Sequence, residues 1–219
     1  MKGIPLKLRK ITDAFLESRG IEVRVEPISI LDEDFQKGVD TRSRTKTKAA
    51  EIEHAIRHHL DIDLDDDPEL QASFSDALQR ILEEFRDNWN KIFEELEKLR
   101  RQIINAGKEP TYGLHRKKQM PFFRTLKKET FGDAELGEDA ISLLVSLTQQ
   151  VFGDVERELK LIGFWESIPA RNKLRADIQR ILLQPEYSTL PGLVKNREHI
   201  ISRILEVAEN NNDTILYSA

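Results

Sequence analysis

The feature that most constrains the fold is a stripe of apolar residues, spaced three or four positions apart, in the first half of the chain. Its members are Phe74, Leu78, Ile81, Phe85, Trp89, Ile92, Leu96, Leu99 and Ile103. The eight steps from first to last cover 29 residues, which is the period of a straight α-helix, whereas a strict 3.5-residue repeat would impose a supercoil. The stripe therefore predicts one long helix with one buried side.

Both ends of this helix carry recognisable signals. Asp67 and Pro68 suit the cap and the first helical position, and Glu69 places an acid at the positive end of the helix dipole. Gly107 and Pro110 follow the last apolar residue and stop the helix. We therefore expect a single helix over residues 68–105, forming the spine of a helical bundle.

The other segments are also mostly helical by pattern. Apolar residues recur at helical spacing in residues 6–19, 48–60, 140–161, 170–183 and 193–209, with Thr45 or Thr47 as the expected cap of the second. Residues 21–27 alternate apolar and charged, which indicates a short strand or extended arm. The predicted fold is mainly α: a helical bundle built around one long central helix, with a short extended N-terminal arm. Residues 1–45 would hold the N-terminal helix and arm, and residues 46–219 the bundle.

Composition limits the classes of protein that fit. Charged residues make up 33%, mean hydropathy is −0.51, and no apolar run is long enough to span a membrane. The first residues lack the apolar core of a signal peptide. Cysteine is absent, which excludes disulfides and thiolate metal sites. We expect a cytoplasmic protein that does not enter the membrane.

Several segments, in order, resemble one known family. Residues 49–58 read Ala-Ala-Glu-Ile-Glu-His-Ala-Ile-Arg-His, residues 25–32 read Val-Glu-Pro-Ile-Ser-Ile-Leu-Asp, and Phe164-Trp165 precede the helical segment 170–182. With Asp67-Pro68 and Trp89 between them, these segments are similar to the C-terminal helical region of the R (motor) subunit of type I restriction enzymes. The resemblance covers residues 21–183.

The resemblance implies an assembly role. In that family the nuclease and helicase parts, which use ATP and Mg, lie earlier in a longer polypeptide that is an ATP-dependent deoxyribonuclease. The C-terminal region is implied to dock the subunit onto the methyltransferase core, made of modification and specificity subunits, and to contact DNA. We expect no cofactor in this chain, because it contains no Gly-x-x-x-x-Gly-Lys-Ser/Thr pattern for a triphosphate.

Two sets of charged residues are candidates for these contacts. The helix predicted over residues 48–60 has a charged face too rich to be needed for folding alone, with subunit-docking candidates Glu51, His54, Arg57 and His58. Residues 111–128 contain six bases and no acid, and these are the DNA-binding candidates: Arg116, Lys117, Lys118, Arg124, Lys127 and Lys128. Phe122 and Phe123 among them are expected to be core anchors.

Each set has an alternative interpretation. Residues 61–69 contain six acids and no base, so the basic segment could pair with them internally instead of with phosphates. His54 and His58 lie four residues apart, a spacing that can hold zinc if a third ligand such as Glu51 joins them. That would make the chain a freestanding helical metal-dependent enzyme or ligand-binding domain. We expect no metal, because no close third ligand is evident.

Overall fold

The computed structural model describes residues 29–42, 44–86 and 88–217. Within these ranges every regular element is helical and no strand occurs, so the predicted mainly-α class is confirmed. The predicted helix over residues 6–19 and the extended arm over residues 21–27 lie outside the described residues.

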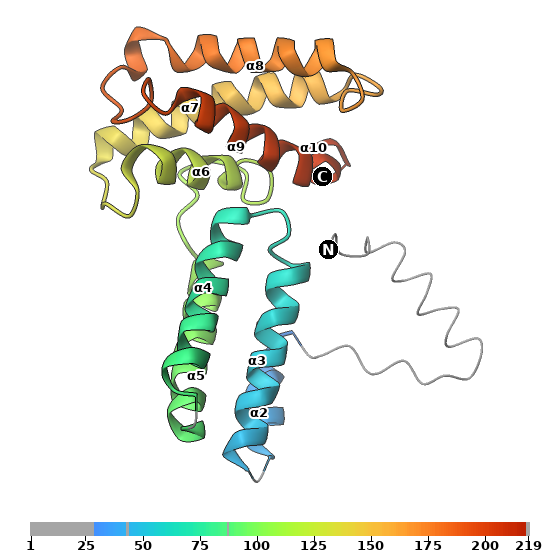
Figure 1. The fold of residues 1–219 in the computed structure, drawn as a ribbon, viewed down its shortest axis with the longest axis vertical. Helices are drawn as coiled ribbons and strands as arrows, with labels where there is room; N and C mark the ends of the chain where they lie inside the picture. Colours follow the sequence, from blue (N-terminus) through green and yellow to red (C-terminus); the bar gives the residue numbers. More distant parts are fainter. Residues whose placement is uncertain (1–28, 43, 87, 218–219) are drawn as a thin grey trace, which may run out of the picture. The chain divides into compact units, whose positions relative to one another are not determined.

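The described chain divides into two compact units. The first comprises the described residues up to Leu64 together with Ser73–Lys108, and the second comprises Asp65–Ala72 and Glu109–Ala219. The helices begin with α2 (Glu33–Asp40), α3 (Thr45–Ile62), α4 (Pro68–Glu84) and α5 (Trp89–Ala106). They continue with α6 (Met120–Phe131), α7 (Glu138–Leu159), α8 (Ile168–Leu182), α9 (Arg197–Asn210) and α10 (Asn212–Tyr217), with a 3₁₀ turn at Pro185–Tyr187 before α9 (Figure 1). The predicted division of the chain at residue 45 stays a prediction.

The prediction of a single long helix over residues 68–105 is wrong. The chain leaves the helix after Glu84, and α5 starts anew at Trp89, so that α4 and α5 run in opposite directions (Figure 1). The side chain of Asn88 accepts a hydrogen bond from the backbone N–H of Lys91 at 3.1 Å and caps the new helix. This asparagine, a preferred N-cap residue, is the local signal that the regular apolar spacing concealed.

The lengths of the helices give the physical reason for this reversal. A continuous helix over residues 68–105 would be about 57 Å long, whereas the 18 residues of α3 extend only about 27 Å. The helix α5 also has 18 residues, and α3 and α5 form the most extensive helix pair of the first unit. A helix broken at residues 85–88 therefore matches its partner in length, which an unbroken one could not do.

The core of the first unit is the contact between α3 and α5. The buried face of α3 carries Ala49, Ile52, Ala55, Ile56 and Leu60, and that of α5 carries Ile92, Leu96, Leu99 and Ile103. Lys46 and Lys48 at the start of α3 lie over the rings of Trp89 and Phe93 at the start of α5. Because their first turns lie together, the two helices run parallel.

A buried arginine attaches α2 to this core. Arg100 of α5 donates hydrogen bonds from Nε to the carbonyl of Ile30 at 3.0 Å and from Nη1 to the side chain of Gln36 at 3.1 Å. Its guanidinium also lies 4.9 Å from the ring centroid of Phe35. A residue that reads as surface charge in the sequence thus holds the first described helix in place.

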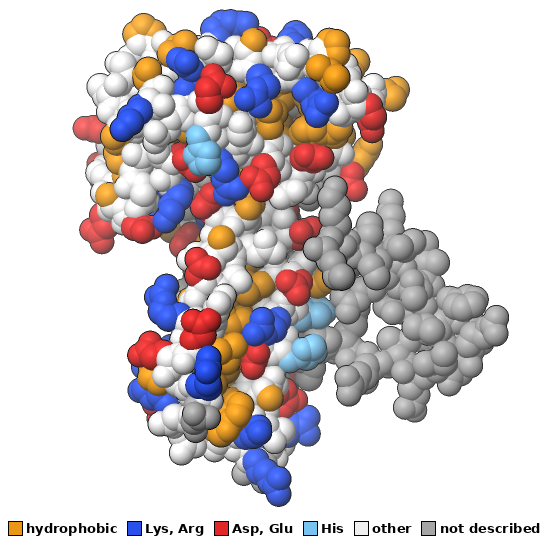
Figure 2. Space-filling view, viewed as in Figure 1, with side chains coloured by type: hydrophobic (Ala, Val, Ile, Leu, Met, Phe, Trp, Pro, Cys, Tyr) orange, Lys and Arg blue, Asp and Glu red, His pale blue; other side chains and the backbone are white. Residues whose placement is uncertain are grey.

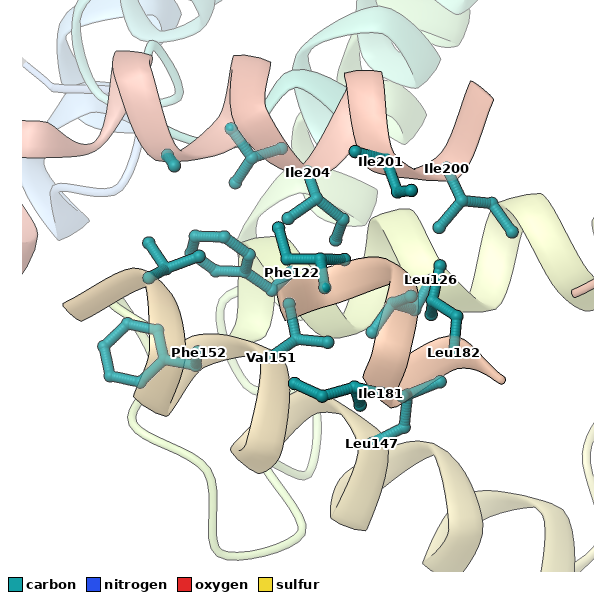
Figure 3. Close-up of a cluster of buried hydrophobic side chains, with 14 of the residues drawn as sticks. Phe122, Leu126, Leu147, Val151, Phe152, Ile181, Leu182, Ile200, Ile201 and Ile204 are labelled. Atoms are coloured by element: carbon teal, nitrogen blue, oxygen red, sulfur yellow. The ribbon is translucent and has the colours of Figure 1, made fainter. Parts of the chain in front are cut away.

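The second unit is a bundle with an aliphatic and aromatic core. Side chains from four helices meet there: Phe122 and Leu126 of α6, Leu147, Val151 and Phe152 of α7, Ile181 and Leu182 of α8, and Ile200, Ile201 and Ile204 of α9 (Figure 3). The rings of Phe122 and Phe152 meet edge to face with centroids 5.6 Å apart. Phe122 and Phe123 are both buried, so the expectation that they are core anchors is confirmed.

Replacing Ile92 by Ala should lower the free energy of unfolding by about 2–5 kcal/mol, because Ile92 is fully enclosed between α3 and α5. Phe85→Ala should cost clearly less, since Phe85 lies half-buried in the turn before α5 and not on its packed face. Urea unfolding followed by far-ultraviolet circular dichroism would measure both. Equal losses would contradict the assignment of Phe85 to the turn.

Candidate functional site

The basic segment forms a turn followed by the helix α6. Residues 116–119 make the turn, and α6 begins at Met120 with Pro121 in its first turn. The apolar side chains of α6, among them Phe122 and Leu126, face the core of the second unit (Figure 3). The segment is therefore a rigid surface feature attached to a packed helix.

The six predicted DNA-binding residues have different surroundings. Arg124 forms an ion pair with Asp67 and lies 3.5 Å from Glu109, and Lys128 pairs with Asp133 at 2.8 Å. Arg116 donates a hydrogen bond to the carbonyl of Glu109 at 2.7 Å. Lys117, Lys118 and Lys127 form no ion pair with any residue that the structure describes. Internal pairing with the acidic segment thus applies to Arg124, while the three lysines remain available to a partner.

Asp67, the partner of Arg124, accepts two hydrogen bonds. One carboxylate oxygen of Asp67 accepts a hydrogen bond from the backbone N–H of Leu70 at 3.2 Å, which caps α4 as the sequence predicted. The other oxygen accepts from Arg124. Burial raises the pKa of Asp67, and the charge of Arg124 and the Leu70 N–H counteract this rise. Without Arg124, the buried carboxylate of Asp67 at the start of α4 would be unpaired. The first role of Arg124 is therefore structural.

Two further contacts hold the segment Asp65–Ala72 within the second unit. Arg203 of α9 donates a hydrogen bond to Glu69 at 2.7 Å, and the side-chain amide of Asn211 donates to the carbonyl of Asp66. Asn211 is completely buried. Two arginines thus pair with Asp67 and Glu69, and the amide of Asn211 satisfies the carbonyl of Asp66.

Asp66 is the most strongly perturbed group of this cluster. Partial burial and then the neighbouring charge of Asp67 raise its pKa to about 6, although the charge of Lys117 opposes the rise. A carboxyl group in this state binds a proton more readily in the folded chain than in the unfolded one. Its contribution to stability is therefore fully present below the unfolded pKa and is lost as pH rises through about 6.

The predicted docking residues lie on the face of α3 away from its buried stripe. His54 and Arg57 are exposed, and His58 is half-buried. Arg57 donates to Glu53 one turn earlier at 3.0 Å. Glu51 accepts two hydrogen bonds from Arg42, from Nε and Nη2, each at 2.9 Å, and the Arg42 hydrogen bond lowers the pKa of Glu51. The face is charged and already ordered by short-range pairs.

The geometry offers the histidine pair no third metal ligand. Glu51, the ligand considered from the sequence, is held by Arg42 on both oxygens. Within residues 29–42, 44–86 and 88–217, no group of three or more His, Asp or Glu side chains is placed to hold a metal ion. The neighbouring His59, which the sequence did not single out, is buried, and its Nδ1 lies 2.6 Å from Asp63.

One cluster could not be recognised in the sequence because it joins residues 43 positions apart. The sequence predicts a polar, basic loop over residues 41–47, yet α3 already begins at Thr45, and Lys46 lies with Nζ 4.8 Å from the ring centroid of Trp89. The sequence presents Trp89 only as part of the apolar stripe and of the family resemblance. A periodicity along one segment cannot show which cation from another segment will meet it.

These features define an all-α domain with charged surfaces and, in its described part, no cluster of metal ligands. Among its described helices none is long and apolar enough to cross a membrane. The chain belongs to the family described as type I restriction enzyme HindI endonuclease subunit-like, C-terminal, whose family model matches residues 13–214. This match confirms the resemblance seen in the sequence. No curated protein and no solved structure matches the chain.

Asp66→Asn should raise the free energy of unfolding at pH 7.5 by about 1–2 kcal/mol, because it removes a carboxylate whose ionisation the fold disfavours. The gain should shrink as pH falls below 6 and vanish near pH 4. Urea unfolding at pH 4, 5 and 7.5 would measure it, with the exposed substitution Asp76→Asn as the matched control. A gain of equal size at every pH would contradict the assignment.

Proposed function

We propose that this chain is an assembly module of a type I restriction endonuclease subunit, which docks that subunit onto the methyltransferase core and contacts DNA. The family match over residues 13–214 is the observation that carries the proposal. The nuclease and motor chemistry, with its ATP and Mg, is assigned to other parts of the parent subunit. The partners that we propose are the modification and specificity subunits and duplex DNA.

The docking part of the proposal concerns α3. Its apolar face is used up by the contact with α5, whereas Glu51, His54, Arg57 and His58 contribute nothing to that core. Charged side chains that ion pairs already hold, as Arg42 holds Glu51 and Glu53 holds Arg57, lose little freedom when a partner binds. This supports α3 as a recognition surface for another subunit.

The DNA part of the proposal concerns the turn before α6 and the helix itself. Lys117, Lys118 and Lys127 form no ion pair in the described chain, and Arg116 is exposed. Three or four cations on one rigid segment can neutralise neighbouring phosphates and release their counterions. Arg124 and Lys128 have partners already, so we propose that they support the segment and contribute less to DNA binding.

Lys118→Glu combined with Lys127→Glu should weaken duplex DNA binding equally for all sequences and should flatten its salt dependence, because two phosphate contacts are lost. Lys117 is left unchanged because its charge also acts on Asp66. Fluorescence anisotropy with labelled duplexes of two unrelated sequences, at several salt concentrations, would measure the effect.

The matched control for this pair is Lys160→Glu with Lys195→Glu, which makes the same change in net charge at two exposed lysines of the same unit. If the control weakens binding as much as the test pair, DNA senses only net charge and the assignment to α6 fails.

Replacing His54, Arg57 and His58 together by Ala should weaken binding to the methyltransferase core by at least tenfold, with no change in duplex DNA binding. Calorimetric titration of the chain with the purified core would measure this. The control replaces three exposed residues of α5, namely Arg101, Gln102 and Asn105, by Ala. Unchanged affinity in the α3 variant, with normal melting behaviour, would contradict docking through this face.

A further inference from the structure

Aromatic and basic side chains gather where α3 and α5 begin. Lys46 lies over Trp89 with Nζ 4.8 Å from the ring centroid, and one turn further Lys48 lies 5.9 Å from that of Phe93. The loop before α3 adds Arg42 and Arg44, and residues 41–48 contain four bases and no acid. In Figure 2, Lys and Arg side chains stand beside hydrophobic ones on the lower part of the α2–α5 unit.

The turn between α4 and α5 makes this end concave. A hollow of about 720 Å³ lies against the turn, lined by Glu84, Phe85, Arg86, Asn88, Trp89 and Asn90. This volume is within the range of clefts that hold small ligands. Two aromatic rings and a guanidinium contribute to the lining, and Glu84 is the one acid among these residues. The lining of the hollow therefore combines flat apolar faces with one positive and one negative charge, and the surplus of positive charge comes from residues 41–48.

The charges at this end are not all used internally. Arg42 pairs with Glu51, Lys48 lies 3.8 Å from Asp40, and Lys91 pairs with Glu94 and Glu95. Arg44, Lys46 and Arg86 form no ion pair with any side chain in the described ranges. In addition, no side chain caps the start of α3, so its first backbone N–H groups face the same end as the three cations. An anion would find both kinds of donor there.

We propose that this end of the first unit, made of Arg44, Lys46, Phe85, Arg86 and Trp89, binds a nucleic-acid strand with unpaired bases. Cations alone would hold any polyanion, but an accessible ring beside them offers a stacking surface that only unpaired bases can use. One base would stack on Trp89 while Arg44, Lys46 and Arg86 contact phosphates.

In the free protein the ammonium group of Lys46 lies over the ring of Trp89. The ammonium group over the indole is a cation–π interaction that is weak when exposed to water. A base arriving on the ring would replace the ammonium, and the ammonium would gain a phosphate in exchange. The surface lies in the first unit and uses none of the residues of the α6 segment, so it goes beyond the proposed duplex contact and does not depend on it.

The test measures the fluorescence of Trp89. The chain has two tryptophans, so Trp165→Phe leaves Trp89 as the only indole in an otherwise full-length chain. Adding an oligothymidylate single strand should quench its fluorescence, with an affinity that falls as salt rises. A duplex of equal length and inorganic polyphosphate, which has no bases, should quench far less.

Four variants in this background decide the assignment. Arg44→Gln with Lys46→Gln should weaken single-strand binding about tenfold or more, while Lys160→Gln with Lys195→Gln in the second unit should leave it unchanged. Trp89→Leu, followed by anisotropy of a labelled strand, should weaken binding roughly 5- to 150-fold, and Trp89→Tyr should restore most of the loss. Circular dichroism would check that each variant folds.

Several results would overturn the proposal. These are equal binding of single strand, duplex and polyphosphate, or an affinity that the Arg44 and Lys46 changes leave intact. Failure of Trp89→Tyr to bind better than Trp89→Leu would show that the ring has only a structural role. None of these outcomes bears on the α6 segment, whose variants are tested with duplex DNA.

Discussion

The fold of the first unit depends on one length relation, the match between α3 and α5. Apolar residues every three or four positions could have been buried along a single helix only if an equally long partner existed. The available partner has 18 residues, and the chain breaks its longest apolar pattern so that the second part, again 18 residues, fits it. The break also has a second effect. It places Trp89 at a helix start beside Lys46, and so creates the concave end that a continuous helix would not have.

In the second unit, the ion pair between Arg124 and Asp67 determines which cations of the basic segment remain free to bind a partner. Arg124 stands in a row of bases that resembles a phosphate-binding segment, but the buried carboxylate of Asp67 binds it. The same carboxylate caps α4, so it is fixed in position. If it released the arginine, its charge would be buried without a partner. The lysines nearby have no such partner in the described chain. A row of six similar charges in the sequence therefore becomes a smaller set of cations that are free to act on another molecule.

The sequence was sufficient for several of the helices and insufficient for the contacts between them. Apolar spacing located α7 and α8 to within two residues, because period and caps are local properties. It failed at Asn88, where the regular spacing continued across a capped turn, and at α3, which begins at Thr45 after Arg44 without a capping side chain. The partners of Arg124 and Lys46 lie 57 and 43 positions away in the chain. Only the packed structure determines such pairs, since many acids and rings were equally available to them in the sequence.

The buried Arg100 has a mechanical consequence. Its guanidinium holds the carbonyls of Ile30 and Asp32, residues that precede α2, from a position about 70 residues later in the chain. A force applied at residue 29 would therefore be transmitted to α5 before α2 could detach. The helix α5 shares the core of the first unit with α3. The chain thus enters the first unit through a fixed anchorage point and not through a free hinge.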